Sequence, residues 1–117
     1  MISSLDRFWK AVGRWESDES RIVVEYSSER APLDPSKPPS FGMLTGTVAR
    51  IDGRSVTFRG LDVHGKEDEL TVDFTGADIR PRGYEKINAD SIACVFGASW
   101  DFARCTLTEL RAPSRIN

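Results

Sequence analysis

Few residues in this chain could carry out chemistry, because it has one histidine and two cysteines. His64 lies beside Gly65 in a polar segment typical of a turn, where a histidine is ordinarily solvated rather than a general base. One histidine and two cysteines fall short of the four ligands of a structural zinc site. The sequence also lacks the motifs of nucleophile elbows, phosphate-binding loops and zinc proteases. We therefore expect no enzymatic activity, no metal and no cofactor.

The two cysteines lie in neighbouring apolar segments near the end of the chain, each with the alternation of a β-strand. Small and apolar residues face one another if these segments form a hairpin that pairs Ile92 with Leu107, Cys94 with Cys105, and Phe96 with Ala103. This register predicts that Cys94 and Cys105 are cross-strand neighbours on the core side. They would be either reduced buried thiols or a cross-strand disulfide, and structural in both cases.

Arginines form the first group of candidate binding residues. Arg50 and Arg59 come from one predicted hairpin and point outward, and Arg80 and Arg82 are followed closely by the aromatic Tyr84. Basic side chains interleaved with an aromatic residue can hold single-stranded nucleic acid through phosphate contacts and base stacking. Acidic residues are interspersed among them, and the net charge of the chain is −2. This balance argues against nucleic acid as the main partner, so a charged partner would have to meet a local face.

Aromatic residues near the end of the last hairpin form the second candidate group. Trp100 and Phe102 lie in the segment 97–102, which we predict to be the hairpin tip. A tryptophan in such a loop either anchors a ligand or partner, or folds back and caps the end of the core. The sequence leaves both interpretations open.

The elements that would position these residues are one helix and about six strands. Leu5, Phe8, Trp9 and Val12 follow the spacing of one helix face, which predicts a helix over residues 3–13 that ends at Gly13. Alternating β-branched and aromatic runs predict strands at 21–27, 43–51, 54–60, 69–75, 91–97 and 103–110. The predicted fold class is all-β with a short N-terminal helix, in which about six antiparallel strands form a small barrel.

The registers of two further hairpins follow from the same requirement, that paired residues point to the same face of the sheet. A two-residue turn around Asp52 and Gly53 would pair Ala49 with Val56 and Thr47 with Phe58. The turn near residues 64–66 must have an odd length if Phe58 is to face Val72 and Val56 is to face Phe74. The acidic run 67–69 that follows is interpreted as a charged strand edge that blocks pairing with another sheet.

The chain of 117 residues is expected to form a single domain over residues 1–117. Four prolines make residues 31–40 an extended loop, and residues 112–117 a C-terminal tail. A signal sequence and a run of 18 apolar residues are both lacking. We therefore expect a cytoplasmic protein without a membrane partner.

Two families of small barrels share parts of this layout. The hairpin over residues 46–58, preceded by a short helix, resembles the bent central hairpin of Sm-like and SH3-like barrels. That resemblance, the favoured one, implies a barrel whose Sm-like members form rings that bind RNA. The tripeptide Gly13-Arg14-Trp15 is similar to the motif that opens the first strand of lipocalin-like barrels. It implies a carrier of apolar small molecules with Trp15 at the barrel floor.

These observations favour a non-enzymatic binding or interaction module of the small β-barrel type. Its partners would be a protein or a small ligand, and edge strands could join copies into a homo-oligomer. The alternatives are a lipocalin-like carrier of a small apolar ligand and, less favoured, single-stranded nucleic acid binding through local arginines. Fold-level resemblance does not decide among them.

Overall fold

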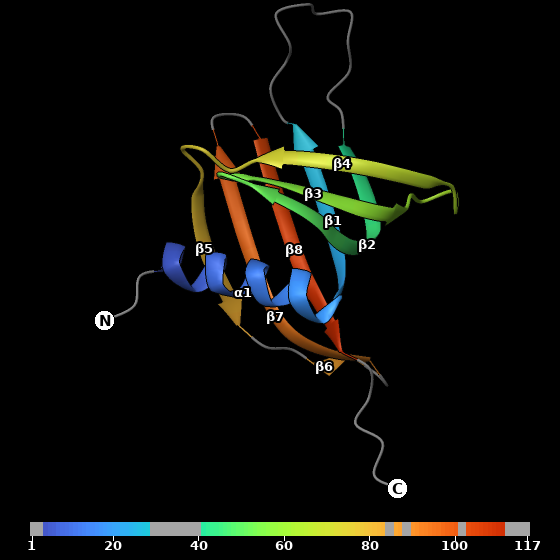
Figure 1. Ribbon diagram of the computed structural model, residues 1–117, viewed down its shortest axis with the longest axis horizontal. Coiled ribbons are helices and arrows are strands. Elements are labelled where there is room, and N and C mark those ends of the chain that lie inside the picture. Colours follow the sequence, from blue (N-terminus) through green and yellow to red (C-terminus); the bar gives the residue numbers. More distant parts are fainter. Residues whose placement is uncertain (1–3, 29–40, 84–85, 88–89, 101–102, 112–117) are drawn as a thin grey trace, which may run out of the picture.

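The protein is described by a computed structural model, which covers residues 4–28, 41–83, 86–87, 90–100 and 103–111 (Figure 1). The Pro-rich segment 31–40 and the tail 112–117 lie outside these residues. The elements are α1 (Ser4–Asp18), β1 (Arg21–Ser28), β2 (Phe41–Asp52), β3 (Ser55–Leu61), β4 (Glu67–Asp73), β5 (Asp78–Gly83), β6 (Lys86–Ile87), β7 (Asp90–Trp100) and β8 (Ala103–Arg111). All six predicted strands are present, and β5 and β6 are additional.

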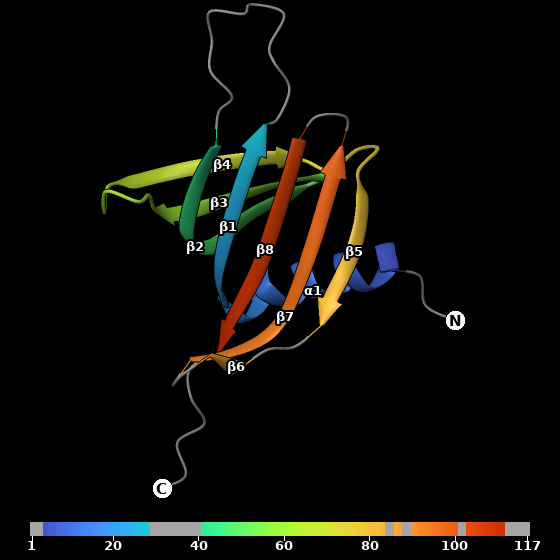
Figure 2. The same cartoon turned by 180° about the vertical axis from the view of Figure 1, so that it is seen from behind.

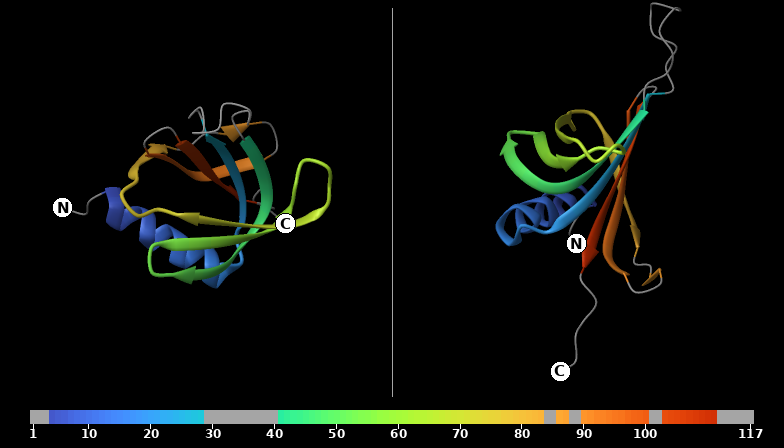
Figure 3. Two further views of the ribbon diagram at one scale, coloured as in Figure 1. Left: turned by 90° about the horizontal axis from the view of Figure 1, so that it is seen from above. Right: turned by 90° about the vertical axis from the view of Figure 1, so that its right-hand side faces the viewer.

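The strands form one antiparallel sheet in the order β4-β3-β2-β1-β8-β7-β5, and the short β6 pairs with β7. The sheet is strongly curved, and the β3–β4 end bends over the same face that α1 covers (Figure 3). Among the described residues β4 and β5 do not pair with each other, so the sheet is not closed. The fold is therefore a mostly antiparallel sheet with one short helix on its concave face.

Helix α1 is longer than predicted and passes through Gly13. A glycine inside a helix costs about 1 kcal/mol relative to alanine, whereas burying one large apolar side chain stabilises by roughly 1.5–3 kcal/mol. Continuing the helix buries Trp15 completely, which outweighs the cost of the glycine. The prediction that Gly13 ends the helix is therefore wrong, and the tripeptide similar to a lipocalin first strand is helical.

The end of α1 is set by backbone geometry beyond the last helical residue. Glu19 has a left-handed backbone with φ of 52°. The backbone N–H of Ser20 donates to the carbonyl of Trp15 at 3.0 Å, and that of Glu19 to the carbonyl of Glu16 at 3.4 Å. These two bonds form a Schellman cap, which satisfies carbonyls that the helix leaves unpaired.

The core lies between α1 and the concave face of the sheet. Phe8 is fully buried, and its ring centroid lies 5.0 Å from that of Phe74 and 5.3 Å from that of Phe96. Val12 and Trp15 continue the same buried stripe along the helix. Phe74 follows β4 and Phe96 lies in β7. The helix therefore contacts residues near both ends of the open sheet.

The last hairpin, β7–β8, has a different register from the predicted one. Cys94 lies opposite Glu109, and Cys105 lies opposite Ala98. The prediction that the two cysteines are cross-strand neighbours is therefore wrong, and both are free thiols. Trp100 is the last residue of β7 and pairs with Ala103, so the turn comes two residues later than predicted. An even displacement keeps the same side chains inward, which is why the predicted faces were correct although the pairs were not.

The other two predicted hairpins also differ in register from the prediction. In β2 the predicted inward face is wrong as well, because Val48 is buried and Ala49 is exposed. In β2–β3, Asp52 pairs with Ser55, and a bulge between Val48 and Arg50 shifts the strand beyond it. The expected pairs are therefore replaced by Ile51 with Val56 and Val48 with Phe58. In β3–β4, Val56 faces Val72 and Phe58 faces Leu70 across an odd loop of residues 62–66. The odd loop length is confirmed, and the pairs are wrong by two residues.

Two paired glycines allow the sheet to curve between β2 and β3. Gly46 lies opposite Gly60, and a Cβ on either would overlap the backbone of the other strand. Only glycine allows this close approach. The acidic run 67–69 is exposed on β4, at one end of the described sheet, as expected for a charged edge. Among the described residues, no helix is long and apolar enough to cross a membrane.

Candidate functional site

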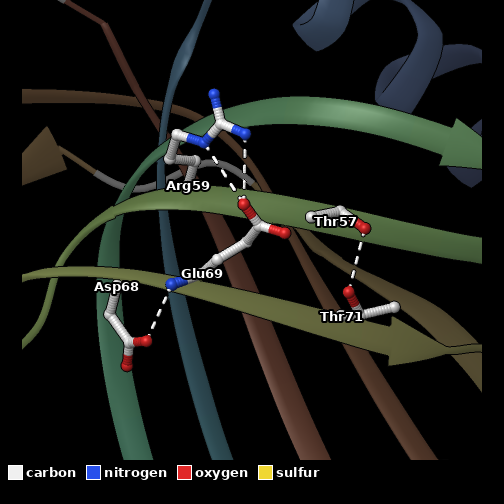
Figure 4. Close-up of polar contacts among 5 residues, drawn as sticks. All are labelled: Thr57, Arg59, Asp68, Glu69 and Thr71. Carbon is white, nitrogen blue, oxygen red and sulfur yellow. Dashed lines mark hydrogen bonds and ion pairs between the residues drawn. The ribbon is translucent and has the colours of Figure 1, made fainter.

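The arginines of the β2–β3 hairpin are exposed, and one of them is engaged within the sheet. Arg59 donates to Oε2 of Glu69 from Nη2 at 3.1 Å and from Nε at 3.3 Å (Figure 4). On the same two strands, the hydroxyls of Thr57 and Thr71 are hydrogen-bonded at 2.9 Å. Arg50 is exposed on β2. These contacts stabilise the cross-strand pairing of β3 and β4.

Trp100 caps the core. Its ring is half-buried and stacks on Phe74, with centroids 5.5 Å apart and planes inclined by 29°. The ring centroid of Tyr26 lies 6.5 Å from that of Trp100. Phe102 and Tyr84 lie outside the described residues. Of the predicted binding residues that the structure describes, only Arg80 and Arg82 share one strand and one cleft.

One cleft lies between α1 and the strands β5 and β7, and we call it the inner cleft. Its volume is about 280 Å³. The cations Arg7, Lys10 and Arg14 line it from one flank of the helix. The remaining lining is supplied by Ala11, Pro81, Cys94, Val95 and Phe96.

Helix geometry explains why these three cations line one cleft. With about 3.6 residues per turn, positions 7, 10 and 14 share one flank of α1. That flank borders the buried stripe of Phe8, Val12 and Trp15, so it faces the sheet edge beside it. These cations were not among the binding residues predicted from the sequence. The available signal was a basic residue directly before Phe8 and another directly before Trp15, at the border of the apolar stripe.

A buried carboxylate lies behind the lining of the inner cleft. Glu109 is 3% exposed, and its Oε1 accepts a hydrogen bond of 2.6 Å from Nη2 of Arg14. The same oxygen accepts the thiol of Cys94 at 3.3 Å. A buried carboxylate is costly unless it is paired and hydrogen-bonded. The ion pair with Glu109 therefore holds Arg14 at one end of the cleft.

The thiol of Cys94 is in its protonated form at neutral pH. Burial, together with the hydrogen bond and charge of Glu109, raises the pKa of Cys94 to about 12. The charge of Arg14 and the indole of Trp15 oppose this increase without cancelling it. Burial likewise raises the pKa of Cys105 to about 12. Neither cysteine is a thiolate nucleophile under ordinary conditions.

A second basic cleft is lined by residues of β5, β7 and β8, and we call it the outer cleft. Figure 2 shows these three strands from the face of the sheet that lies away from α1. Arg80, Arg82 and Arg104 line it, and Pro81 borders both clefts. The Arg82 side chain lies across Gly97, where an added Cβ would be 3.2 Å from its Cδ. Arg80 is paired with Asp78 at 3.2 Å, and both side chains are more than half exposed.

The chemistry available in these clefts is recognition of negative charge. Among the described residues, His, Cys, Asp and Glu side chains do not gather into a group that could hold a metal ion. His64 is exposed in the β3–β4 turn, where its backbone N–H donates to Asp62 at 2.8 Å. The backbone N–H groups of Lys66 and His64 lower the pKa of Asp62. The histidine therefore belongs to a solvated turn, as the sequence analysis expected.

Comparison with known proteins does not assign the chain to a class. It matches no family model and no curated protein.

Proposed function

We propose that this protein is a non-enzymatic binding module, that its ligand site is the inner cleft, and that the ligand is a small organic anion. The observation that carries the proposal is the arrangement of Arg7, Lys10 and Arg14 along one wall of a cleft with apolar residues opposite. Cations recognise the negative group of a ligand, and the apolar lining contacts its hydrocarbon part.

The surface cleft is favoured over an internal cavity of lipocalin type. Phe8, Val12 and Trp15 are fully buried against the concave face, where such a carrier would hold its ligand. A ligand in the cleft beside the helix would leave this packing of α1 on the sheet in place. Closure of the sheet into a small barrel of Sm-like or SH3-like layout stays a hypothesis for the whole chain.

The cleft is also favoured over edge strands as the binding surface. β4 carries acidic residues at positions 67–69, and β5 carries Pro81, which lacks a backbone N–H. Charged residues and proline on edge strands discourage pairing with another chain. Self-association through the edges is the second hypothesis, and light scattering separates the two: a mass of 13.1 kDa favours the ligand-binding monomer.

Nuclear magnetic resonance titration of the full chain with sodium glutarate at low salt tests the proposal. Backbone amide signals of Ala11, Cys94 and Val95 should shift in a saturable way, because these residues line the cleft. Lys10→Gln should weaken the response, since it removes a cleft cation but keeps a polar side chain.

Arg59→Gln is the matched control, because Arg59 is exposed on β3 and outside the inner cleft. It should leave the titration unchanged. If the cleft signals do not shift, or if both variants weaken the response equally, the proposed site is wrong.

A further inference from the structure

We infer that the inner cleft selects a linear dicarboxylate of four to six carbon atoms. This inference rests on the proposed function and specifies its ligand class. Four features of the cleft support it: the separation of its cations, its charge, its volume and its apolar lining.

The cations are spread along the helix rather than gathered at one point. At about 1.5 Å per residue, Arg7 and Arg14 emerge roughly 10.5 Å apart along the axis. Arg14 is held at its end by Glu109, which it contacts through Nη2 at 2.6 Å. A guanidinium has further N–H donors, so Arg14 can still donate to a ligand. Two separated donors fit a ligand with a negative group at each end.

The charge of the cleft matches a dianion. Arg7, Lys10 and Arg14 line it, and Glu109 compensates one of these charges through its ion pair with Arg14. No ion pair within the described ranges involves Arg7 or Lys10. The described groups at the cleft therefore leave an excess of two positive charges, which two carboxylates would neutralise.

The size of the cleft is that of a small organic diacid. Its volume is about 280 Å³. A water molecule takes about 30 Å³ of liquid volume, so the cleft has room for about nine non-hydrogen atoms. Dicarboxylates of four to six carbons have eight to ten such atoms. Inorganic phosphate would leave most of the cleft empty.

The apolar lining of the cleft accounts for the hydrocarbon part of the ligand. Ala11, Pro81 and Phe96 line the cleft and cannot satisfy polar groups with their side chains. A methylene chain between two carboxylates would contact these residues and be removed from water. Polyhydroxylated diacids would lose hydration there without compensation and should bind less well.

The test is isothermal titration calorimetry of the full chain at low salt with glutarate and with pentanoate. The two ligands have the same carbon chain, but only glutarate has a carboxylate at each end. We expect glutarate to bind at least tenfold more tightly than pentanoate. Arg7→Gln should reduce this preference to less than threefold, because the second carboxylate would lose its partner, whereas Arg59→Gln should preserve it.

The outcomes separate this inference from the proposed function. Equal affinity for glutarate and pentanoate, with amide shifts at the cleft, would overturn the dicarboxylate selectivity and keep the anion site. Tighter binding of inorganic phosphate than of glutarate would have the same meaning. If glutarate, pentanoate and inorganic phosphate all leave the amide signals of the cleft unchanged, the proposed function itself is wrong.

Discussion

The two basic clefts share the edge strand β5 but differ in what holds their cations. In the inner cleft, Arg14 is bound to the buried carboxylate of Glu109. In the outer cleft, Arg80 is paired with Asp78 two residues away, and both side chains are largely exposed. An exposed ion pair stabilises a protein by about 0–1 kcal/mol, because water and salt screen it. By contrast, removing the partner of a buried carboxylate strongly destabilises a protein.

This difference shows why arginine content alone does not identify a binding site. The arginines that were conspicuous in the sequence, Arg80 and Arg82, lie on an open face with a local counter-charge. The cations of the inner cleft can be recognised as a group only from the packing of the helix on the sheet. The position of a cation relative to buried groups determines whether it can organise a site.

The largest expected effect comes from breaking the packing that forms the inner cleft. Phe8→Ala should reduce the free energy of unfolding by about 3–5 kcal/mol, because it removes a fully buried ring from the helix–sheet interface. Urea denaturation followed by circular dichroism measures this. Leu5→Ala on the same helix is the control, since Leu5 is 38% exposed, and it should cost about 0.5 kcal/mol. Equal costs would show that α1 is not held by its buried stripe.

The second prediction compares one arginine from each cleft. Arg14→Ala should destabilise by about 1–3 kcal/mol because it removes the ion pair between Arg14 and the buried carboxylate of Glu109. Arg80→Ala should change the stability by no more than about 0.5 kcal/mol, because its pair is exposed. Thermal and urea denaturation of both variants provide the comparison.

A double variant distinguishes the buried charge from simple loss of side-chain packing. Arg14→Met combined with Glu109→Leu should recover most of the lost stability, since an apolar pair avoids the cost of burying a carboxylate. If the double variant is as unstable as Arg14→Ala, packing rather than charge explains the effect of Arg14.

The smallest effect concerns the two thiols, of which Cys94 lines the inner cleft and Cys105 the outer. Burial raises the pKa of each to about 12 from the ordinary value of 9.0. Between these values the unfolded chain releases protons that the folded chain retains. The stabilising contribution is therefore complete below pH 9 and is lost as the pH rises towards 12.

For Cys105 the expected loss is about 1 kcal/mol between pH 9 and 10, and it is smaller for the more exposed Cys94. Urea denaturation at pH 7, 9 and 10 measures it. A variant with both Cys94→Ala and Cys105→Ala should show a flatter decline over this range. Identical slopes for the two proteins would contradict the raised pKa values.

The sequence predicted the faces of the strands better than their pairing. Alternation of apolar and polar residues is local, so it assigned Phe96, Cys105 and Leu107 to the core correctly. Register depends on where each turn falls, and that position was decided by packing elsewhere. Trp100 belongs to β7 and not to the loop, and its ring stacks on Phe74 from the other end of the sheet.

The candidate site was the least predictable part of the molecule. The predicted arginines and aromatics are dispersed, because β3 and β5 lie near opposite ends of the strand order. β5 itself was not predicted, since its six residues include a proline and two arginines. Strand propensity does not favour such a segment, and only pairing with β7 makes it a strand.

The sequence by itself determined that the chain forms a helix and antiparallel strands, which side chains face inward, and that metal-ligand and nucleophile motifs are lacking. Those features depend on residue type and on spacing within a few positions. The tertiary structure decided the open sheet, the separation of the two cysteines and the inner cleft. These depend on contacts between residues far apart in the chain, such as Arg14 with Glu109, whose burial and pairing only packing can create.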